Sequence, residues 1–151
     1  MAKKLGQECK FYHSDTLLDG STNVPGTVAW SEITNIRDLT LNLETGEADV
    51  TTRANNGWRA TKATLKDGSI EFEMLWETGD AGFTALKTAW ANGEEIALAA
   101  MDGDIELSGS EGLVGNFAVT NFSRSEPLEE GVTVSVTVKP ASQTDWYEVT
   151  A

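Results

Sequence analysis

The sequence predicts a mainly β protein, an antiparallel β-sandwich or barrel flanked by one α-helix. Two observations support this prediction. Most of the structured segments alternate between apolar and polar residues, as strands with one buried face do. Only one segment has apolar residues at helical spacing. We expect a single domain over residues 1–151, with a long loop between two strands and extended arms at both termini.

The clearest local pattern lies between Trp58 and Trp76. The dipeptide Asp67-Gly68 is typical of tight turns, so we expect a β-hairpin with strands at 58–65 and 70–76. Four apolar residues of its second strand share one face, with Leu75 as the exception: Ile70, Phe72, Met74 and Trp76. The acidic residues that follow the same alternation share the opposite face: Glu71, Glu73 and Glu77.

Residues 44–57, just before this hairpin, are too polar to belong to a core. The segment is also longer than the roughly 2–5 residues of an ordinary hairpin loop. Long loops on a rigid sheet commonly carry contacts with other molecules. We therefore predict a contact element at 44–57.

Clean alternation predicts further strands at 36–44 and 132–138. Strands are also predicted at 95–101 and 113–122, with weaker candidates at 9–13 and 28–33. In the strand at 36–44, the residues expected to point inward are Leu39, Leu41 and Leu43. An acidic, glycine-rich loop is expected at 102–112.

One helix is predicted between Asp80 as its N-cap and Gly93 just after its end. Its apolar anchors, expected to pack against the sheet, are Phe83, Leu86 and Trp90. Residues 1–26 are polar and irregular and are expected to form an N-terminal arm, and residues 143–151 a tail with two aromatic side chains.

Composition limits the possible functions. The chain has 11 basic and 24 acidic side chains, a formal net charge of −13, which disfavours a surface that grips nucleic acid. Cys9 is the only cysteine, so an internal disulfide is excluded. No signal peptide or membrane-spanning run is recognisable, so synthesis in the cytoplasm and no membrane partner are expected.

No motif predicts catalytic, cofactor-binding or metal-binding residues. His13 and Cys9 are best interpreted as a surface histidine and a partly buried cysteine, because no third group is placed to orient them. Two pairs of carboxylates, Glu71/Glu73 and Asp102/Asp104, fit solvated surface positions better than catalysis in so acidic a chain.

Five tryptophans leave a carbohydrate-binding β-sandwich module as an alternative, since indole rings stack on sugars. Trp76 and Trp90 occupy inward positions and are expected in the core. Trp30, Trp58 and Trp146 lie at the edges of predicted elements, where an interface contact and packing within the chain are both open.

The order of elements resembles the major tail tube proteins of long-tailed bacteriophages, the lambda-like tail tube family. The resemblance extends from about Phe11 to about Pro140. It rests on these segments, in this order: Trp30–Ile33, Asn35–Leu39, the acidic loop leading to Asn56-Gly57-Trp58-Arg59-Ala60, Phe72–Trp76, Phe83–Trp90 and Val119–Glu130.

The resemblance implies a structural subunit of a virion tail whose partners are copies of itself, in hexameric rings stacked into a tube. It also implies a tape measure protein in the lumen, a tail terminator, a distal tail protein, and DNA that passes without specific binding. The residues of the long loop that would touch the neighbouring ring are Glu44, Glu47, Asp49, Arg53, Asn55, Asn56 and Trp58.

The acidic composition suits such a tube, because an acidic bore keeps phosphates off its wall. We expect Glu71, Glu73 and Glu77 to line the bore or a seam between subunits. Further candidate interface residues are Arg37, Arg59, Lys62, Trp146 and Tyr147. A second alternative keeps the tube and changes the machine, to a phage-derived injection or secretion device.

Overall fold

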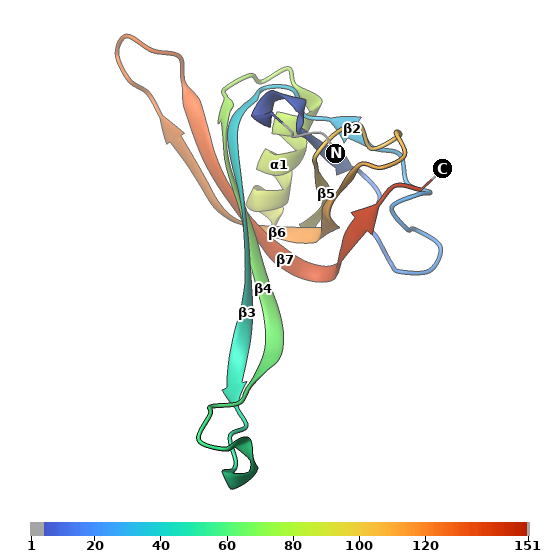
Figure 1. The fold of residues 1–151 in the computed structure, drawn as a ribbon. Coiled ribbons are helices and arrows are strands. Elements are labelled where there is room, and N and C mark those ends of the chain that lie inside the picture. Colours follow the sequence, from blue (N-terminus) through green and yellow to red (C-terminus); the bar gives the residue numbers. More distant parts are fainter. Residues whose placement is uncertain (1–4, 151) are drawn as a thin grey trace.

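The computed structural model describes residues 5–150. Its elements are the 3₁₀ turns η1 (Gly6–Glu8) and η2 (Arg53–Asn55), the helix α1 (Ala81–Asn92), and the strands β1 (Lys10–Ser14), β2 (Ser31–Glu32), β3 (Ile36–Asp49), β4 (Thr61–Leu75), β5 (Glu95–Met101), β6 (Glu111–Ser125) and β7 (Thr133–Glu148). All strand pairs are antiparallel, in one sheet of order β2-β1-β5-β6-β7-β4-β3. The predicted mainly β class with one flanking helix is confirmed (Figure 1).

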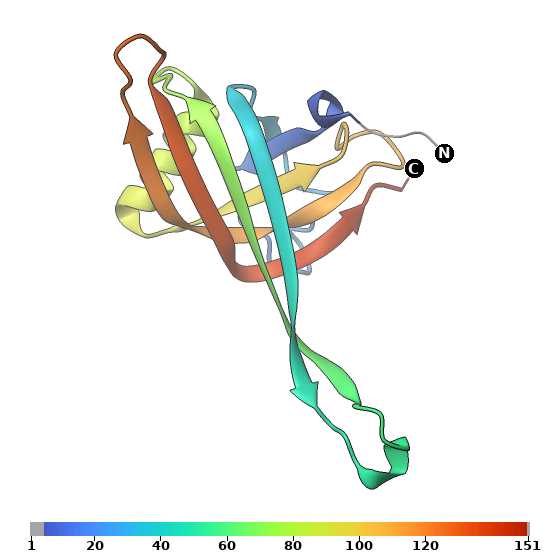
Figure 2. The same cartoon turned by 60° about the vertical axis from the view of Figure 1, so that its left-hand side comes forward.

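The sheet has two parts because β6 and β7 are long and bend midway (Figure 2). Register shifts interrupt their pairing around Asn116 and between Val119 and Asn121, and bulges of this kind bend strands. The part that contains β3, β4 and residues 119–125 and 133–138 is called the arm half below. The other part, with β1, β2, β5 and the remainder of β6 and β7, is called the core half.

The main hydrophobic core lies between α1 and the sheet. The side chains it buries completely include Phe83 and Leu86 from α1 and Ile70 and Met74 from β4. A smaller cluster around Tyr12, Leu18 and Val114 lies apart from it and also takes residues from β5, where Ala99 and Met101 alternate with main-core residues. The core half is therefore covered on both faces, which explains why β5 is buried almost throughout.

The helix begins and ends as predicted. Asp80 accepts a 2.9 Å hydrogen bond from the backbone N–H of Phe83, and Gly93 takes the left-handed conformation at the C-terminal end. Trp90 differs from the prediction, because its side chain is 51% exposed and stacks on Phe122 with ring centroids 6.1 Å apart. It lies at the border of the core rather than inside it.

The predicted hairpin turn at Asp67-Gly68 is wrong. β4 runs without interruption through both residues, which pair with Glu44 and Leu43 of β3. The local turn preference is overridden because the neighbouring strand supplies a continuous ladder for this backbone. The chain reverses instead at residues 50–60, so Glu44, Glu47 and Asp49 belong to β3 and not to a loop.

The leucines of β3 are less buried than predicted. Leu41 is half-buried against the main core, but Leu39 is 36% and Leu43 55% exposed. β3 is the edge strand of the sheet, and its C-terminal part leaves the body together with β4 (Figures 1 and 2). Among the described elements, α1 contacts the sheet at β5 and β6, so Leu39 and Leu43 on the distant edge strand stay exposed.

Both predicted terminal arms contain strands. Residues 10–14 form β1, which pairs with β5 and buries Phe11 and Tyr12. Residues 143–148 are the end of β7, where Trp146 pairs with Leu113 and Tyr147 with Gly112. The segment predicted as a C-terminal tail is therefore paired as far as Glu148, because β6 continues far enough to meet it. Residues 1–4 and 151 lie outside the described residues.

Candidate assembly surfaces

Near the body, the arm half has one face against the main core and α1, and the other face is bare. Register places Glu71 beside Thr137 and Thr40, and Glu73 beside Ser135 and Asp38, on the face opposite to the buried valines of β7. The carboxylates of this bare face are Asp38, Glu44, Asp67, Glu71 and Glu73. Most of its other members are Ser, Thr and Asn side chains, so the face is hydrophilic and acidic.

Two of the three predicted face carboxylates are where the sequence placed them. Glu71 and Glu73 share the bare face, but Glu77 lies beyond the end of β4 in the connection to α1. β4 ends at Leu75, and residues 76–80 form the turn that leads into α1 at Ala81. Glu77 is exposed there and is not part of the face.

Arg37, a predicted interface residue, contacts its own chain. Its Nη1 lies 3.7 Å from Glu73 Oε1 across β3 and β4, with both side chains partly exposed. An ion pair of this exposure is worth about 0–1 kcal/mol. Its main effect is to neutralise one of the carboxylates of the bare face.

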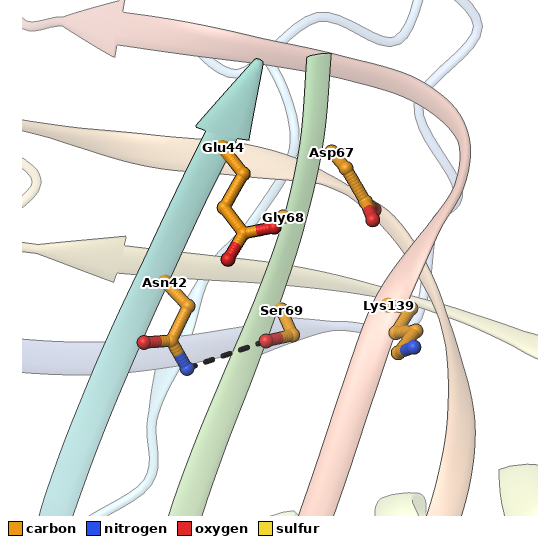
Figure 3. A pocket seen from close by; sticks show the side chains of 6 residues that line it. All are labelled: Asn42, Glu44, Asp67, Gly68, Ser69 and Lys139. Carbon is orange, nitrogen blue, oxygen red and sulfur yellow. Dashed lines mark hydrogen bonds between the residues drawn. The ribbon is translucent and has the colours of Figure 1, made fainter. Parts of the chain in front are cut away.

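A shallow depression lies on the bare face where β3 and β4 leave the body (Figure 3). Its lining residues come from β3, β4 and β7: Asn42, Glu44, Asp67, Gly68, Ser69 and Lys139. Asn42 donates a 3.4 Å hydrogen bond to Ser69 Oγ. Among the described residues, no group of three or more potential ligands is close enough to hold a metal ion.

The hairpin of β3 and β4 extends from the body as a long arm, which ends in η2 (Figures 1 and 2). The reversal at its tip is internally ordered. Val50 N–H donates to Ala60 O at 3.0 Å, and Thr52 N–H donates to Asn55 Oδ1 at 2.7 Å. Asn56 takes the left-handed conformation that allows the chain to turn after η2.

Most side chains of the tip face solvent. Trp58 is 79% exposed, and Arg53, Arg59 and Lys62 are exposed as well. At the base of the tip, the hydroxyl and backbone N–H of Thr51 lower the pKa of the Asp49 carboxyl by hydrogen bonding. The β3–β4 arm therefore projects from the body with an ordered tip. The tip contributes no residue to either hydrophobic core.

The tryptophans do not form a common sugar platform. Trp76 packs edge-on against Phe83 in the main core, and Trp30 packs against the smaller core while its Nε1–H donates to Pro25 O at 2.9 Å. Trp146 is half-exposed and donates to Glu111, and Tyr147 packs against the smaller core. With Trp58 on the arm, the indole rings lie on separate parts of the molecule.

The burial of Cys9 and His13 is the reverse of what the sequence predicted. Cys9 is exposed, whereas His13 is buried in β1, where its backbone pairs with β5. The alternation of β1 could not show this, because both faces of the core half are covered. In the described part of the chain, no helix is both long and apolar enough to cross a membrane.

Comparison with known proteins agrees with this geometry. A family model described as phage tail tube protein matches residues 14–144, so the chain belongs to the phage tail tube protein family and is a structural subunit of a tail tube. A search of curated proteins gave no match.

Solved structures share the fold at low identity. A chain from the tail of an empty gene transfer agent (GTA) particle, refined with C6 symmetry, is 16% identical with a TM-score of 0.72, and the match covers 96% of this chain and 99% of that one. A chain of the SPP1 tail tube is 16% identical with a TM-score of 0.70, covering 99% and 81%. A chain of the anti-feeding prophage baseplate is 11% identical with a TM-score of 0.57, covering 99% and 98%.

Proposed function

We propose that copies of this chain join edge to edge into hexameric rings, and that the rings stack into a hollow tube that conducts DNA. The observation that carries the proposal is that the arm half is a four-stranded sheet with two unpaired edges. Its strands lie in the order β6, β7, β4 and β3. β5 pairs only with residues 112–118 of β6, so within the described residues nothing pairs with the outer edge of 119–125. β3 has a free edge on the opposite side.

The strands at the two free edges run in the directions that antiparallel pairing between copies requires. Four successive antiparallel strands make β3 and β6 run in opposite directions. Rotation of a copy about a ring axis preserves that relation, so β3 of one copy meets β6 of the next as an antiparallel pair. Exposed edges are an aggregation hazard in a monomer, and pairing with the next copy removes the hazard.

The position of the bulky elements supports one choice of the face that lines the bore. α1 and the core half lie on one side of the arm half and are too bulky for the inside of a narrow ring (Figure 2). The bare face with Glu71 and Glu73 therefore faces the lumen. A wall of carboxylates and hydroxyls repels phosphates, so DNA passes without binding.

Axial stacking is the role of the arm, including the residues predicted at 44–57. A heterologous contact that does not close on itself generates a filament. The same proposal extends to a tape measure protein in the lumen, a tail terminator and a distal tail protein at the two ends. It places the assembled protein in a virion tail after synthesis in the host bacterial cytoplasm.

An injection or secretion device is a second candidate, because the fold is shared with a chain of the anti-feeding prophage baseplate. Rings built in the same way would then conduct a different cargo. The acidic bare face favours DNA, since a strongly negative wall suits a polyanion that must not adhere.

Cryo-electron microscopy of the concentrated, purified protein tests the proposal. We expect tubes in which β3 of one copy hydrogen-bonds to residues 119–125 of the next and α1 lies outside. Tubes with α1 facing the bore would refute the lumen assignment. A protein that stays monomeric at every concentration and salt would refute the assembly itself.

A further inference from the structure

The tip of the arm differs in charge from the rest of the molecule. Residues 50–62 carry three basic side chains, Arg53, Arg59 and Lys62, in a chain of formal net charge −13. Asp49 pairs with Thr61 at the base of this tip, so the tip remains net positive with that carboxylate included. None of the three forms an ion pair within the described residues. Each is exposed beside the exposed Trp58. A basic and aromatic tip without internal partners is suited to an acidic surface with an apolar element.

The connection between β6 and β7 has the complementary composition. Residues 125–132 carry Glu126, Glu129 and Glu130 and no basic side chain. All three are exposed, and Leu128 between them is 100% exposed. Glu126 pairs with Arg124 at 2.9 Å, so the two other carboxylates carry the charge available to a partner.

The two tips point in opposite directions from the body. In both views the β3–β4 arm leaves at one end, and the β6–β7 connection, drawn in orange and red, projects from the other (Figures 1 and 2). An arm cannot reach the acidic tip of its own chain. The same tip on a copy placed end to end with it is the surface that the arm approaches first.

We propose that the basic arm tip at 50–62 docks on the acidic tip at 125–132 of a copy in the next ring. Arg59 and Lys62 pair with Glu129 and Glu130 of that copy, and Trp58 packs on Leu128 of that copy. This inference rests on the proposed stacking and names its contact. The contact also explains why all rings in a tube would point the same way. Arm-to-arm and tip-to-tip contacts bring like charges together, whereas head-to-tail stacking of rings brings opposite charges together.

Charge reversal tests the contact. An arm-reversed variant carries Arg59→Glu and Lys62→Glu, a tip-reversed variant carries Glu129→Lys and Glu130→Lys, and a third variant combines all four changes. We expect each reversal to raise the critical concentration for tube formation at least about tenfold, since many copies of the contact act together in a ring. The combined variant should polymerise within about threefold of the unchanged protein, because it restores opposite signs.

The control for the tip-reversed variant is Glu94→Lys with Glu106→Lys, which makes the same change in net charge at exposed positions outside both tips. The control should polymerise like the unchanged protein. All altered side chains are exposed, and thermal denaturation of each monomer verifies folding.

A crosslink gives an independent readout in a Cys9→Ser background. Two single-cysteine variants, Ala54→Cys and Leu128→Cys, are mixed under polymerising conditions and oxidised, with Ala54→Cys plus Glu94→Cys as the control pair. We expect crosslinked dimers from the first mixture only. Normal tubes without this crosslink, or a combined reversal that fails to recover, would overturn the docking and leave the proposed function standing. Failure of the unchanged protein to form tubes would overturn both.

Discussion

The side-chain amide of Asn116 and the backbone of Leu18 exchange two hydrogen bonds across 98 residues of sequence. Leu18 N–H donates to Asn116 Oδ1 at 2.9 Å, and Asn116 Nδ2 donates to Leu18 O at 2.7 Å. Asn116 is buried in β6 and also donates to Ser142 Oγ at 3.1 Å. One side chain thus holds the long connection between β1 and β2 against the bend of β6 and β7.

Replacing Asn116 by Ala should destabilise the monomer by about 1–3 kcal/mol, because the N–H and C=O of Leu18 lose their partner in a buried place. Urea denaturation of the monomer measures the loss. Ser142→Ala is the matched control: it removes the bond from Asn116 to Ser142 and the exposed bond that Ser142 Oγ donates to Glu95, but it leaves Leu18 paired, so it should cost less. Equal losses in the two variants would contradict the role given to the Leu18 contact.

Shortening the arm should abolish tubes and leave the monomer folded. Asp49 and Thr61 are paired, so residues 50–60 can be replaced by Asn-Gly, which suits a two-residue hairpin turn. The melting temperature should stay within a few degrees of the unchanged protein, because the removed residues belong to neither core. Electron microscopy and sedimentation measure polymerisation. Tubes of ordinary length from this variant would show that the arm tip is dispensable.

Reversing charge on the bare face should make tubes retain DNA. We expect tubes of the Glu71→Lys, Glu73→Lys variant to bind short duplexes at low salt and release them at high salt, because phosphate contacts are screened. Co-pelleting with a fluorescent duplex measures retention. The Glu94→Lys, Glu106→Lys variant carries the same charge change elsewhere. If it retained as much DNA, the bare face would not be the lumen wall.

The loop around Asp19 should lose stability in acid. Backbone N–H groups of Ser21 and Asn23 donate to the Asp19 carboxylate, both at 2.9 Å, and lower its pKa from the ordinary 3.8. A lowered pKa in the folded state stabilises the fold above pH 3.8, and this contribution disappears as pH falls through the lowered pKa.

Asp19→Asn should therefore lower the melting temperature at neutral pH, and the difference from the unchanged protein should shrink below about pH 4. Asp15→Asn makes the same change in charge at an exposed position and should have a smaller effect at neutral pH. Thermal denaturation across pH measures both. A difference for Asp19→Asn that does not change with pH would contradict the role of the ionised carboxylate.

The identity of most elements was available from the sequence alone, because it depends on local patterning. The alternation of Val134, Val136 and Val138 follows from side-chain period, and the capping of α1 by Asp80 and Gly93 follows from cap chemistry. The bounds of β5 were also predicted, from a short apolar run between polar segments. The alternation of acidic and apolar residues in β4 also predicted correctly that Glu71 and Glu73 share one face.

Only the tertiary structure decided what those strands pair with. Asp67-Gly68 became mid-strand because β3 extends beside it, and the predicted tail became the end of β7 because β6 runs far enough to meet it. Whether a face is bare or covered depends on where α1 and the connections pack, which is a long-range property that no local window contains. For the same reason the opposed positions of the basic and acidic tips appear only once β3, β4, β6 and β7 share one sheet.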